Sequence, residues 1–290
     1  MQGLVWESEP PRLRSPILVC AFAGWNDAAG AATTALTAVG DALDAEQIAQ
    51  VDPEEFFDFQ ANRPNIRLTE GETREIDWPG NVLYAARAHR AENDLLLLSG
   101  TEPNLRWRTF AEGIAGAADS LGVQMVVTLG ALIADVAHSL PVPITGLASD
   151  EELAERLSLT RSNYEGPTGI VGVLHDACRR RGIPSASLWA AVPHYVAAVP
   201  NPKAALALLR RLEGLVGVAV EAGGLEEEAD TYDSQVGRAV AANPEIEELV
   251  ERLEEEQADR IELEDDLPSG EALAEDFERF LRQHGPGPDG

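Results

Sequence analysis

Three short, largely apolar runs constrain the fold of this chain more than any other feature. They are ILVCAFAG (17–24), DLLLLSG (94–100) and VQMVVTLGAL (123–132). Continuous apolar runs of this length are typical of strands that are covered on both faces. Helical spacing follows the first two runs, with Leu36 and Val39 after one and Phe110 and Ile114 after the other. This order of strand, helix and strand predicts an α/β fold with a largely parallel sheet and helices on its faces.

The alternation of strands and helices continues to about residue 217. Between 54 and 87, the segments EEFFDF, REIDW and NVLYAAR predict shorter strands that are edge-like or antiparallel. SDEELAERL predicts a helix that opens on a capping box beginning at Ser149. GPTGIVGVLHDACRRRG predicts a helix that starts at Pro167 and ends near Gly182, and SASLWAAVP predicts a further strand. NPKAALALLRRLEGLVG predicts a helix with Asn201 as its cap.

The C-terminal part of the chain is acidic and lacks strand patterns. Residues 221–290 carry 23 Asp and Glu against 5 Arg, in a chain whose net charge is −28. EEEADTYDSQVGRAVAAN, NPEIEELVERLEEEQADRIE and LPSGEALAEDFERFLRQHG predict helices, and in the second Asn243 is the expected cap. We therefore expect an α/β domain over 1–220 and an acidic helical segment over 221–290. The apolar seams of these helices indicate that the segment packs on that domain or on another subunit.

Charge and cysteine usage exclude several classes of protein. The negative field repels phosphate backbones and anionic lipid, and the densest basic cluster, 179–181, points in three directions on a helix. We therefore expect neither nucleic-acid nor membrane binding. No apolar run approaches the roughly 18 residues of a membrane-spanning helix. Cys20 and Cys178 lie in apolar or helical patterns, which predicts buried thiols and a cytoplasmic setting rather than a disulfide framework.

The stretch FAGWNDAAGAAT (22–33) lies at a turn from strand to helix. In open α/β sheets ligands bind beyond the carboxyl ends of the strands, which here are the segments 24–27, 99–104 and 130–134. Asn26 or Asp27 can cap the following helix, and an acidic first turn disfavours a bound phosphate. The pattern favours a capped turn in which Trp25 packs as a plug, over a phosphate site.

Complete catalytic motifs are missing from the sequence. The single lysine, Lys203, lies outside any P-loop, the glycines of GPTGIVG do not have dinucleotide-binding spacing, and there is no G-x-S-x-G elbow. None of the five histidines is paired at the zinc spacing. Ser99, Asp135 and either His138 or His194 could be chosen as a catalytic triad, but any chain of this length offers such a set. We therefore predict no catalytic residue, no metal and no cofactor.

Several sequence blocks taken together resemble a known family. They are GWNDAAGAAT, SGTEPNLRWRTF, GALIADVAHSLPVPITGLASD, SNYEGPTGIVGVLHDACRRRGIPSASLWAAVPHYV and PNPKAALALL. In this order, over about 15–217, they are similar to the proteasome assembly chaperone 2 family in its bacterial, actinobacteria-like branch. The resemblance implies a three-layer α/β/α sandwich, similar to nucleoside phosphorylases and related hydrolases, with a C-terminal helical appendage. It also implies self-association, with a trimer as one arrangement, and in eukaryotic and archaeal relatives binding to proteasome α subunits.

Two functional hypotheses follow. The first is a cytoplasmic, homo-oligomeric, proteasome-assembly-chaperone-like protein that acts by protein–protein interaction with proteasome subunits. Chaperones of this family often end in a hydrophobic residue, tyrosine and one further residue; because this chain ends in QHGPGPDG, docking by that tail is not expected. The alternative is a phosphorylase-like or hydrolase-like enzyme, or a binder of a small polar ligand. Its candidate pocket residues lie in loops at strand ends: Trp25, Asn26, Asp27, Glu102, Asn104, Asn163, Tyr164 and Glu165.

Overall fold

A nine-stranded sheet forms the centre of the molecule in the computed structural model, which describes residues 4–7, 9–69 and 73–263. The strand order is β1-β3-β6-β7-β2-β8-β11-β9-β10. The three apolar runs form β2 (Ile17–Ala23), β7 (Leu95–Thr101) and β8 (Met125–Ala134), and these are neighbours. With β11 (Ser185–Pro193) they make four adjacent parallel strands, which confirms the prediction for the middle of the sheet.

Both flanks of the sheet contain antiparallel pairs. On one side β6 (Asn81–Ala86) runs antiparallel to β7, and β3 (Glu46–Val51) and β1 (Leu4–Trp6) continue that pattern. On the other side β9 (Ile144–Ala148) runs antiparallel to β11 and is followed by the short β10 (Thr160–Arg161). The sheet is therefore mixed, with its parallel strands in the middle.

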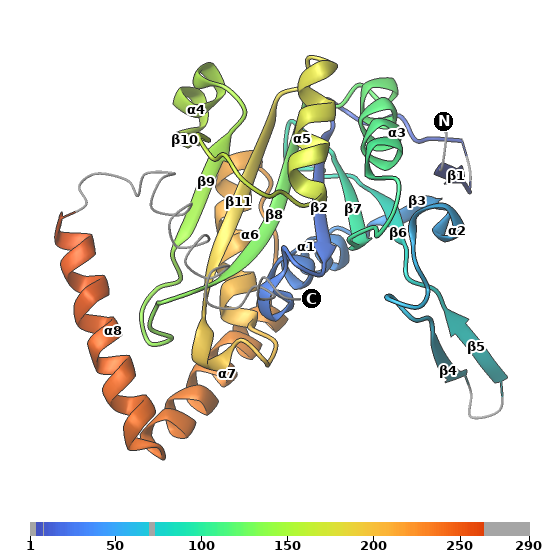
Figure 1. Cartoon of the computed structure of the whole chain (residues 1–290). Coiled ribbons are helices and arrows are strands. Elements are labelled where there is room, and N and C mark those ends of the chain that lie inside the picture. The colour runs from blue at the N-terminus through green and yellow to red at the C-terminus, as the bar shows by residue number, and fades with distance from the viewer. Residues whose placement is uncertain (1–3, 8, 70–72, 264–290) are drawn as a thin grey trace.

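Helices cover the two faces of the sheet and create three layers (Figure 1). Along β2, Ile17, Val19 and Ala21 face a core that includes α1 (Ala31–Ala42) and α6 (Pro202–Val216). The alternate residues Leu18, Cys20 and Phe22 face a second core with α3 (Trp107–Ser120) and α5 (Ile170–Arg180). Because the side chains of a strand alternate between its faces, the run is apolar throughout. The α/β/α sandwich is confirmed.

The segment 54–87 differs in part from its prediction. EEFFDF, predicted as a strand, instead contains helix α2 (Pro53–Phe56), because Asp52 caps it by accepting from the Glu54 N–H at 3.1 Å and Pro53 is suited to a first helical position. REIDW contains β5 (Thr73–Asp77), which pairs with β4 (Asn65–Thr69) in a separate two-stranded hairpin. NVLYAAR contains β6, which lies inside the sheet rather than at its edge and is antiparallel to both neighbours, as the second predicted alternative states.

Two of the predicted helix starts differ from those in the structure, and a third is confirmed. Helix α4 (Glu151–Leu157) is capped by Asp150, whose carboxylate accepts from the Leu153 N–H at 2.9 Å, and not by Ser149. Helix α5 begins at Ile170 rather than at Pro167. Asn201 caps α6 as predicted, by accepting from the Ala204 N–H at 2.9 Å.

Two acidic helices follow the sandwich, α7 (Gly223–Ala241) and α8 (Pro244–Leu263). Val250 and Leu253 of α8 are buried against Tyr232 and Val236 of α7, which confirms the predicted apolar seam. Lys203, at the start of α6, pairs with Asp233 of α7 at 2.8 Å. The helix predicted over LPSGEALAEDFERFLRQHG lies outside the described residues. Within the described part of the chain, no helix has the length and apolar character needed to cross a bilayer.

Candidate functional site

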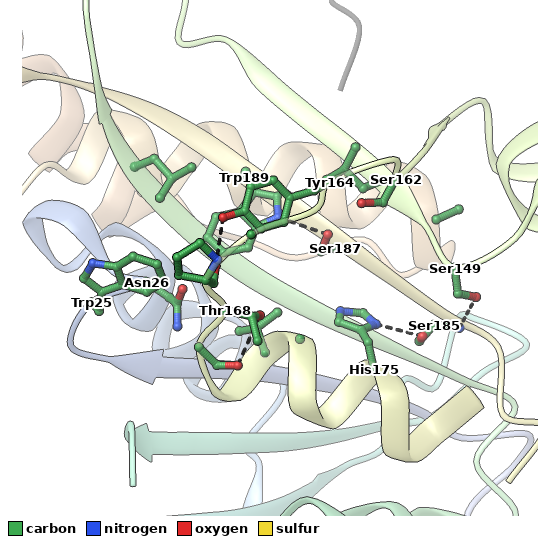
Figure 2. A pocket seen from close by; sticks show the side chains of 18 residues that line it. Trp25, Asn26, Ser149, Ser162, Tyr164, Thr168, His175, Ser185, Ser187 and Trp189 are labelled. Carbon is green, nitrogen blue, oxygen red and sulfur yellow. Dashed lines mark hydrogen bonds between the residues drawn. The ribbon is translucent and has the colours of Figure 1, made fainter. Parts of the chain in front are cut away.

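A cavity of about 440 Å³ lies between α5 and the strands β9 and β11 (Figure 2). On β11, Ser185, Ser187 and Trp189 line the cavity, whereas Ala186 and Leu188 point into the core on the opposite face. The sequence SASLW thus gives this strand a hydroxyl and aromatic face and an apolar face. The remaining wall comes from α5, from β9 and Ser149 after it, from the loop 162–169, from Trp25 and Asn26 in the turn after β2, and from Leu132 of β8.

His175 of α5 lies at one end of the cavity (Figure 2). Its Nε2 is 2.9 Å from Thr128 Oγ1, and its Nδ1 is 2.7 Å from Ser185 Oγ. Burial lowers the pKa of His175 to about 4, so the imidazole is neutral at neutral pH. A neutral imidazole with a hydroxyl partner on each nitrogen is a structural group of the cavity wall.

Trp189 reaches into the cavity because the neighbouring strand carries a glycine. Gly130 lies opposite Trp189 in the register of β8 and β11. A Cβ at Gly130 would lie 2.3 Å from the indole ring, so a larger residue would displace the ring. The indole N–H donates to Ser187 Oγ at 3.0 Å. Tyr164 lines the same space, and its hydroxyl donates to the Pro167 carbonyl at 2.8 Å within the loop 162–169.

The prediction that Trp25 packs into the turn as a plug is wrong. The Trp25 side chain is 43% exposed and lies at the other end of the cavity from His175. The reason is the backbone of the turn: Gly24 has a φ of +130°, and the Asp27 N–H donates to the Gly24 carbonyl at 3.1 Å. The turn therefore buries Asn26, whose carbonyl accepts from the Ala131 N–H at 2.8 Å, and leaves Trp25 outside the core.

Asp27 bonds to the first turn of α1, but neither predicted residue is the N-cap of that helix, which is Gly30 because a 3-10 turn over Ala28–Gly30 intervenes. Its Oδ1 accepts from the Ala32 N–H at 2.7 Å, and its Oδ2 accepts from the Thr33 hydroxyl at 2.5 Å. Burial raises the pKa of Asp27, and these hydrogen bonds oppose the shift. The carboxylate is engaged with the first turn of α1 and is not part of the cavity wall.

Glu102 accepts hydrogen bonds at the N-terminus of α5. Its Oε1 accepts from the Ile170 N–H at 2.8 Å and from Asn26 Nδ2 at 3.3 Å. Gly169 makes this approach possible, since a Cβ there would lie 2.7 Å from both Glu102 Oε1 and Asn26 Nδ2. A carboxylate therefore already occupies the positive end of the α5 dipole.

The structure brings only some of the eight predicted pocket residues together. Trp25, Asn26 and Tyr164 line the cavity, and Glu102 supports it through Asn26. Asn104 lies elsewhere, where its Oδ1 accepts from the Asp58 N–H at 3.1 Å. Asn163 and Glu165 are exposed residues of the 162–169 loop and are absent from the cavity wall.

Reasoning from the sequence missed most of the cavity. The missed lining residues include Ser149, Ser162, Thr168, His175, Ser185, Ser187 and Trp189. The alternation of hydroxyl and aromatic side chains in SASLWAAVP could have indicated the three on β11, because a strand covered by helices on both faces normally carries apolar residues on both faces.

Among the residues that the structure describes, the side chains of the candidate triad are not all brought together. His194 Nδ1 lies 3.1 Å from Asp135, whereas His138 bonds to Tyr195, and among the described residues Ser99 makes no side-chain hydrogen bond to either histidine. The described part of the chain holds no cluster of three or more metal-ligating side chains. Cys20 and Cys178 are free and buried as predicted, and burial raises the pKa of both, that of Cys178 to about 11.

The β4–β5 hairpin is a second candidate site, of a different kind. It projects away from the sandwich (Figure 1). Ile66 lies opposite Ile76 across the hairpin, and Leu68 is on the same face as Ile66. Ile66 and Leu68 are each 64% exposed and Ile76 is 52% exposed. An isolated hairpin with an uncovered apolar face is typical of a surface that binds another protein.

The opposite face of the hairpin is charged. It carries Arg67, Glu75 and Asp77, and Arg67 forms an ion pair with Asp77 across the strands. At the base of the hairpin Trp78 packs against Phe59, with ring centroids 4.8 Å apart and the rings tilted by 58°. The face of Ile66, Leu68 and Ile76, which we call the apolar hairpin face, also carries Arg74 opposite Leu68 and is the more apolar of the two.

Comparisons with known proteins agree on one family. The model of the PAC2 family matches residues 21–240. A crystal structure of a PAC2 family protein from Streptomyces avermitilis has 45% identity and a TM-score of 0.75, covering 81% of this chain and 99% of that one. A proteasome-assembly chaperone homologue from Mycobacterium tuberculosis has 43% identity, a TM-score of 0.73 and coverage of 81% and 99%.

A further structure extends the similarity along the chain. A Mycobacterium tuberculosis protein of unknown function has 28% identity and a TM-score of 0.82, and the match covers 90% of this chain and 93% of that one. A search of proteins with curated functions gives no match.

Proposed function

This chain belongs to the PAC2 family, and on that premise we propose that it is a proteasome-assembly-chaperone-like protein that acts by protein–protein contact. The observation that carries the proposal is the family match over 21–240, together with 43% identity to a protein whose name is proteasome-assembly chaperone homologue. The partners that this name indicates are proteasome subunits during assembly. The protein works in the cytoplasm in this proposal.

The apolar hairpin face supports a role in binding proteins. Fully burying an exposed Ile or Leu side chain contributes about 1.5–3 kcal/mol. Ile66 and Ile76 are each more than half exposed, so covering this cross-strand pair contributes about 2–3 kcal/mol to a complex. We therefore assign the apolar hairpin face to the contact with a proteasome subunit.

Self-association and the acidic segment complete the proposal. The family resemblance implies a homo-oligomer, with a trimer as one arrangement. The division into a sandwich over 1–220 and an acidic segment over 221–290 assigns a separate task to each part. Acidic faces on α7 and α8 would steer a basic partner surface and set the rate of encounter, since charge complementarity acts mainly on association rates.

Native mass spectrometry with half-assembled proteasome α and β subunits tests the proposed function. We expect a complex between this chain and one subunit type, and a change in the rate at which proteasome particles form. If no complex is detected and the assembly rate is unchanged, the proposed function is wrong.

A matched pair of variants tests the assigned surface. Ile66→Ser with Ile76→Ser should weaken subunit binding about 30-fold to 150-fold, which corresponds to the loss of about 2–3 kcal/mol. Glu75→Ser, next to Ile76 on the charged face, is the control and should bind like the wild type. Light scattering after size exclusion separates the two kinds of contact. If the double variant loses its oligomeric state but keeps its subunit affinity, the apolar hairpin face is an interface between copies and the assignment fails.

A further inference from the structure

We propose that the cavity between α5 and the strands β9 and β11 is a binding site for an uncharged ligand that contains a planar ring and hydrogen-bonding groups. The proposal does not rest on the proposed function, because the cavity and the apolar hairpin face consist of different residues. It rests on the charge of the cavity wall, on its size and on the groups that it presents.

The wall of the cavity carries no charged side chain. No Asp, Glu, Lys or Arg is among the 18 described residues that form it, although the chain has a net charge of −28. Its one histidine, His175, is neutral at neutral pH. A charged ligand would lose its hydration here without meeting a counter-charge, and such a transfer is costly. The wall itself therefore offers no counter-charge to an ion of either sign.

The start of α5 strengthens the case against an anion. A helix N-terminus is where phosphate or carboxylate groups bind in many proteins. Thr168, Gly169, Val171 and Gly172 bring this end of α5 to the cavity. Glu102 already accepts from the first N–H of the helix, and its negative charge repels a second anion. A neutral ligand meets no such repulsion.

Size and surface fit a small ring-bearing molecule. A volume of about 440 Å³ lies within the roughly 300–1,000 Å³ of small-molecule sites. Trp25 and Tyr164 add aromatic surface to that of Trp189, and aromatic rings pair with other rings by stacking or edge contacts (Figure 2). Three aromatic side chains around one cavity favour a planar ring over a flexible chain.

Hydroxyl groups supply the hydrogen bonds. Ser187 accepts from the Trp189 N–H, so its own hydroxyl hydrogen remains to be donated to a ligand. Ser162 and Thr168 line the same space and can donate or accept. Hydroxyls adapt to either role, which suits a ligand with alcohol, carbonyl or amide groups.

A set of three indoles that differ in charge tests the proposal on the full-length protein. Indole-3-ethanol is neutral, indole-3-acetate is an anion and tryptamine is a cation at neutral pH, and all three share one ring. Saturation-transfer NMR titrations give the affinity of each. We expect indole-3-ethanol to bind and each charged analogue to bind at least about tenfold more weakly. If none of them binds, or if a charged analogue binds as well as the alcohol, the proposal is wrong.

Matched variants place the binding in the cavity. Ser162→Trp fills the mouth of the cavity from an exposed loop position and should abolish the indole-3-ethanol signal. Ser234→Trp makes the same change at an exposed position of α7 and should leave the signal intact. Circular dichroism establishes that both variants are folded. Equal binding by the two variants would place the indole elsewhere and overturn the assignment of the cavity.

Discussion

Replacing Asp94 with Asn should lower the free energy of unfolding by about 2–4 kcal/mol, because this carboxylate fixes the starts of two adjacent strands. Asp94 precedes β7 and is 2% exposed. Its Oδ2 accepts from the backbone N–H of Arg14 at 2.8 Å, and its Oδ1 accepts from the backbone N–H of Ala88 at 3.1 Å. Arg14 leads into β2, so the carboxylate holds Ile17 opposite Leu95 in the parallel register.

The magnitude follows from what an asparagine cannot do at this position. Whichever way its amide is turned, an NH₂ group replaces one oxygen and faces a backbone N–H donor. A hydrogen bond to a charged group contributes about 1.5–3 kcal/mol, and a buried donor left without an acceptor costs about 1–3 kcal/mol. The Arg14 guanidinium also bonds to both oxygens, but its side chain is 53% exposed and water screens its attraction. The two backbone bonds therefore account for the expected loss.

Urea unfolding followed by tryptophan fluorescence measures this loss, and Asp176→Asn is the matched control. Asp176 is a half-exposed residue of α5 whose carboxylate, within the described residues, bonds only to the side chains of Arg179 and Arg180. Exposed pairs of this kind contribute less than about 1 kcal/mol and are screened by salt. Equal losses of stability in the two variants would refute the argument that the buried backbone bonds carry the effect.

The pKa of Asp94 adds a pH signature. Burial acts to raise this pKa, but the bonds from Arg14 and from the Ala88 N–H outweigh it and hold the pKa below its usual value. A lowered folded-state pKa contributes stability that is present above the unfolded pKa of about 3.9 and is lost as the pH falls through the folded value. The stability gap between wild type and Asp94→Asn should therefore be constant near neutral pH and narrow below about pH 4. A gap of constant size in acid would contradict the sign of this shift.

Three further predictions concern the surroundings of the cavity. Asp27→Ala removes the carboxylate that accepts from the Ala32 N–H in the first turn of α1 and should lower the free energy of unfolding by about 1–2 kcal/mol in the same urea assay. Gly169→Val forces a side chain against Glu102 at the start of α5 and should lower the free energy of unfolding, measured by calorimetry, by about 1–3 kcal/mol. An unchanged melting temperature would show that Glu102 does not lie tightly against position 169. Cys20 and Cys178 should not react with a thiol reagent at neutral pH in the native protein, because burial raises the pKa values of both thiols, and both should react in urea. Rapid labelling of either thiol in the native protein would contradict their burial in the core that includes α3 and α5.

The four parallel strands in the middle of the sheet can be predicted from the sequence because each of them is a local pattern. SASLWAAVP coincides with β11, and the three apolar runs coincide with β2, β7 and β8 to within two residues at most ends. β9 is not predicted, because Ile144–Ala148 is short and contains Gly146, a residue that normally interrupts a strand pattern. The packing of the fold explains the glycine at position 146, since a Cβ there would lie 2.4 Å from the Leu159 side chain.

The candidate site could be predicted only at one end. The rule that ligands bind beyond the carboxyl ends of parallel strands identifies Trp25 and Asn26, which follow β2. The cavity instead extends along the face of the sheet to Ser185, at the first residue of β11. Its extent depends on β9 pairing antiparallel to β11 beside α5, which is a property of the topology and of no single segment. The position of Trp25 likewise depends on the backbone of Gly24, which a pattern of apolar spacing does not contain.

The two faces of β11 argue that the cavity is a built feature of the fold rather than a packing defect. Ala186 and Leu188 fill the core beneath the strand, as expected for a strand between layers. Ser185 and Ser187 on the other face are almost fully buried, and a buried hydroxyl destabilises the fold unless it has a hydrogen-bond partner. His175 and Trp189 supply those partners, so the polar face is supported by side chains from two elements. A strand selected only for packing would carry Val or Ala at these positions, and the maintenance of satisfied hydroxyls beside an open space is what a site for a hydrogen-bonding ligand requires.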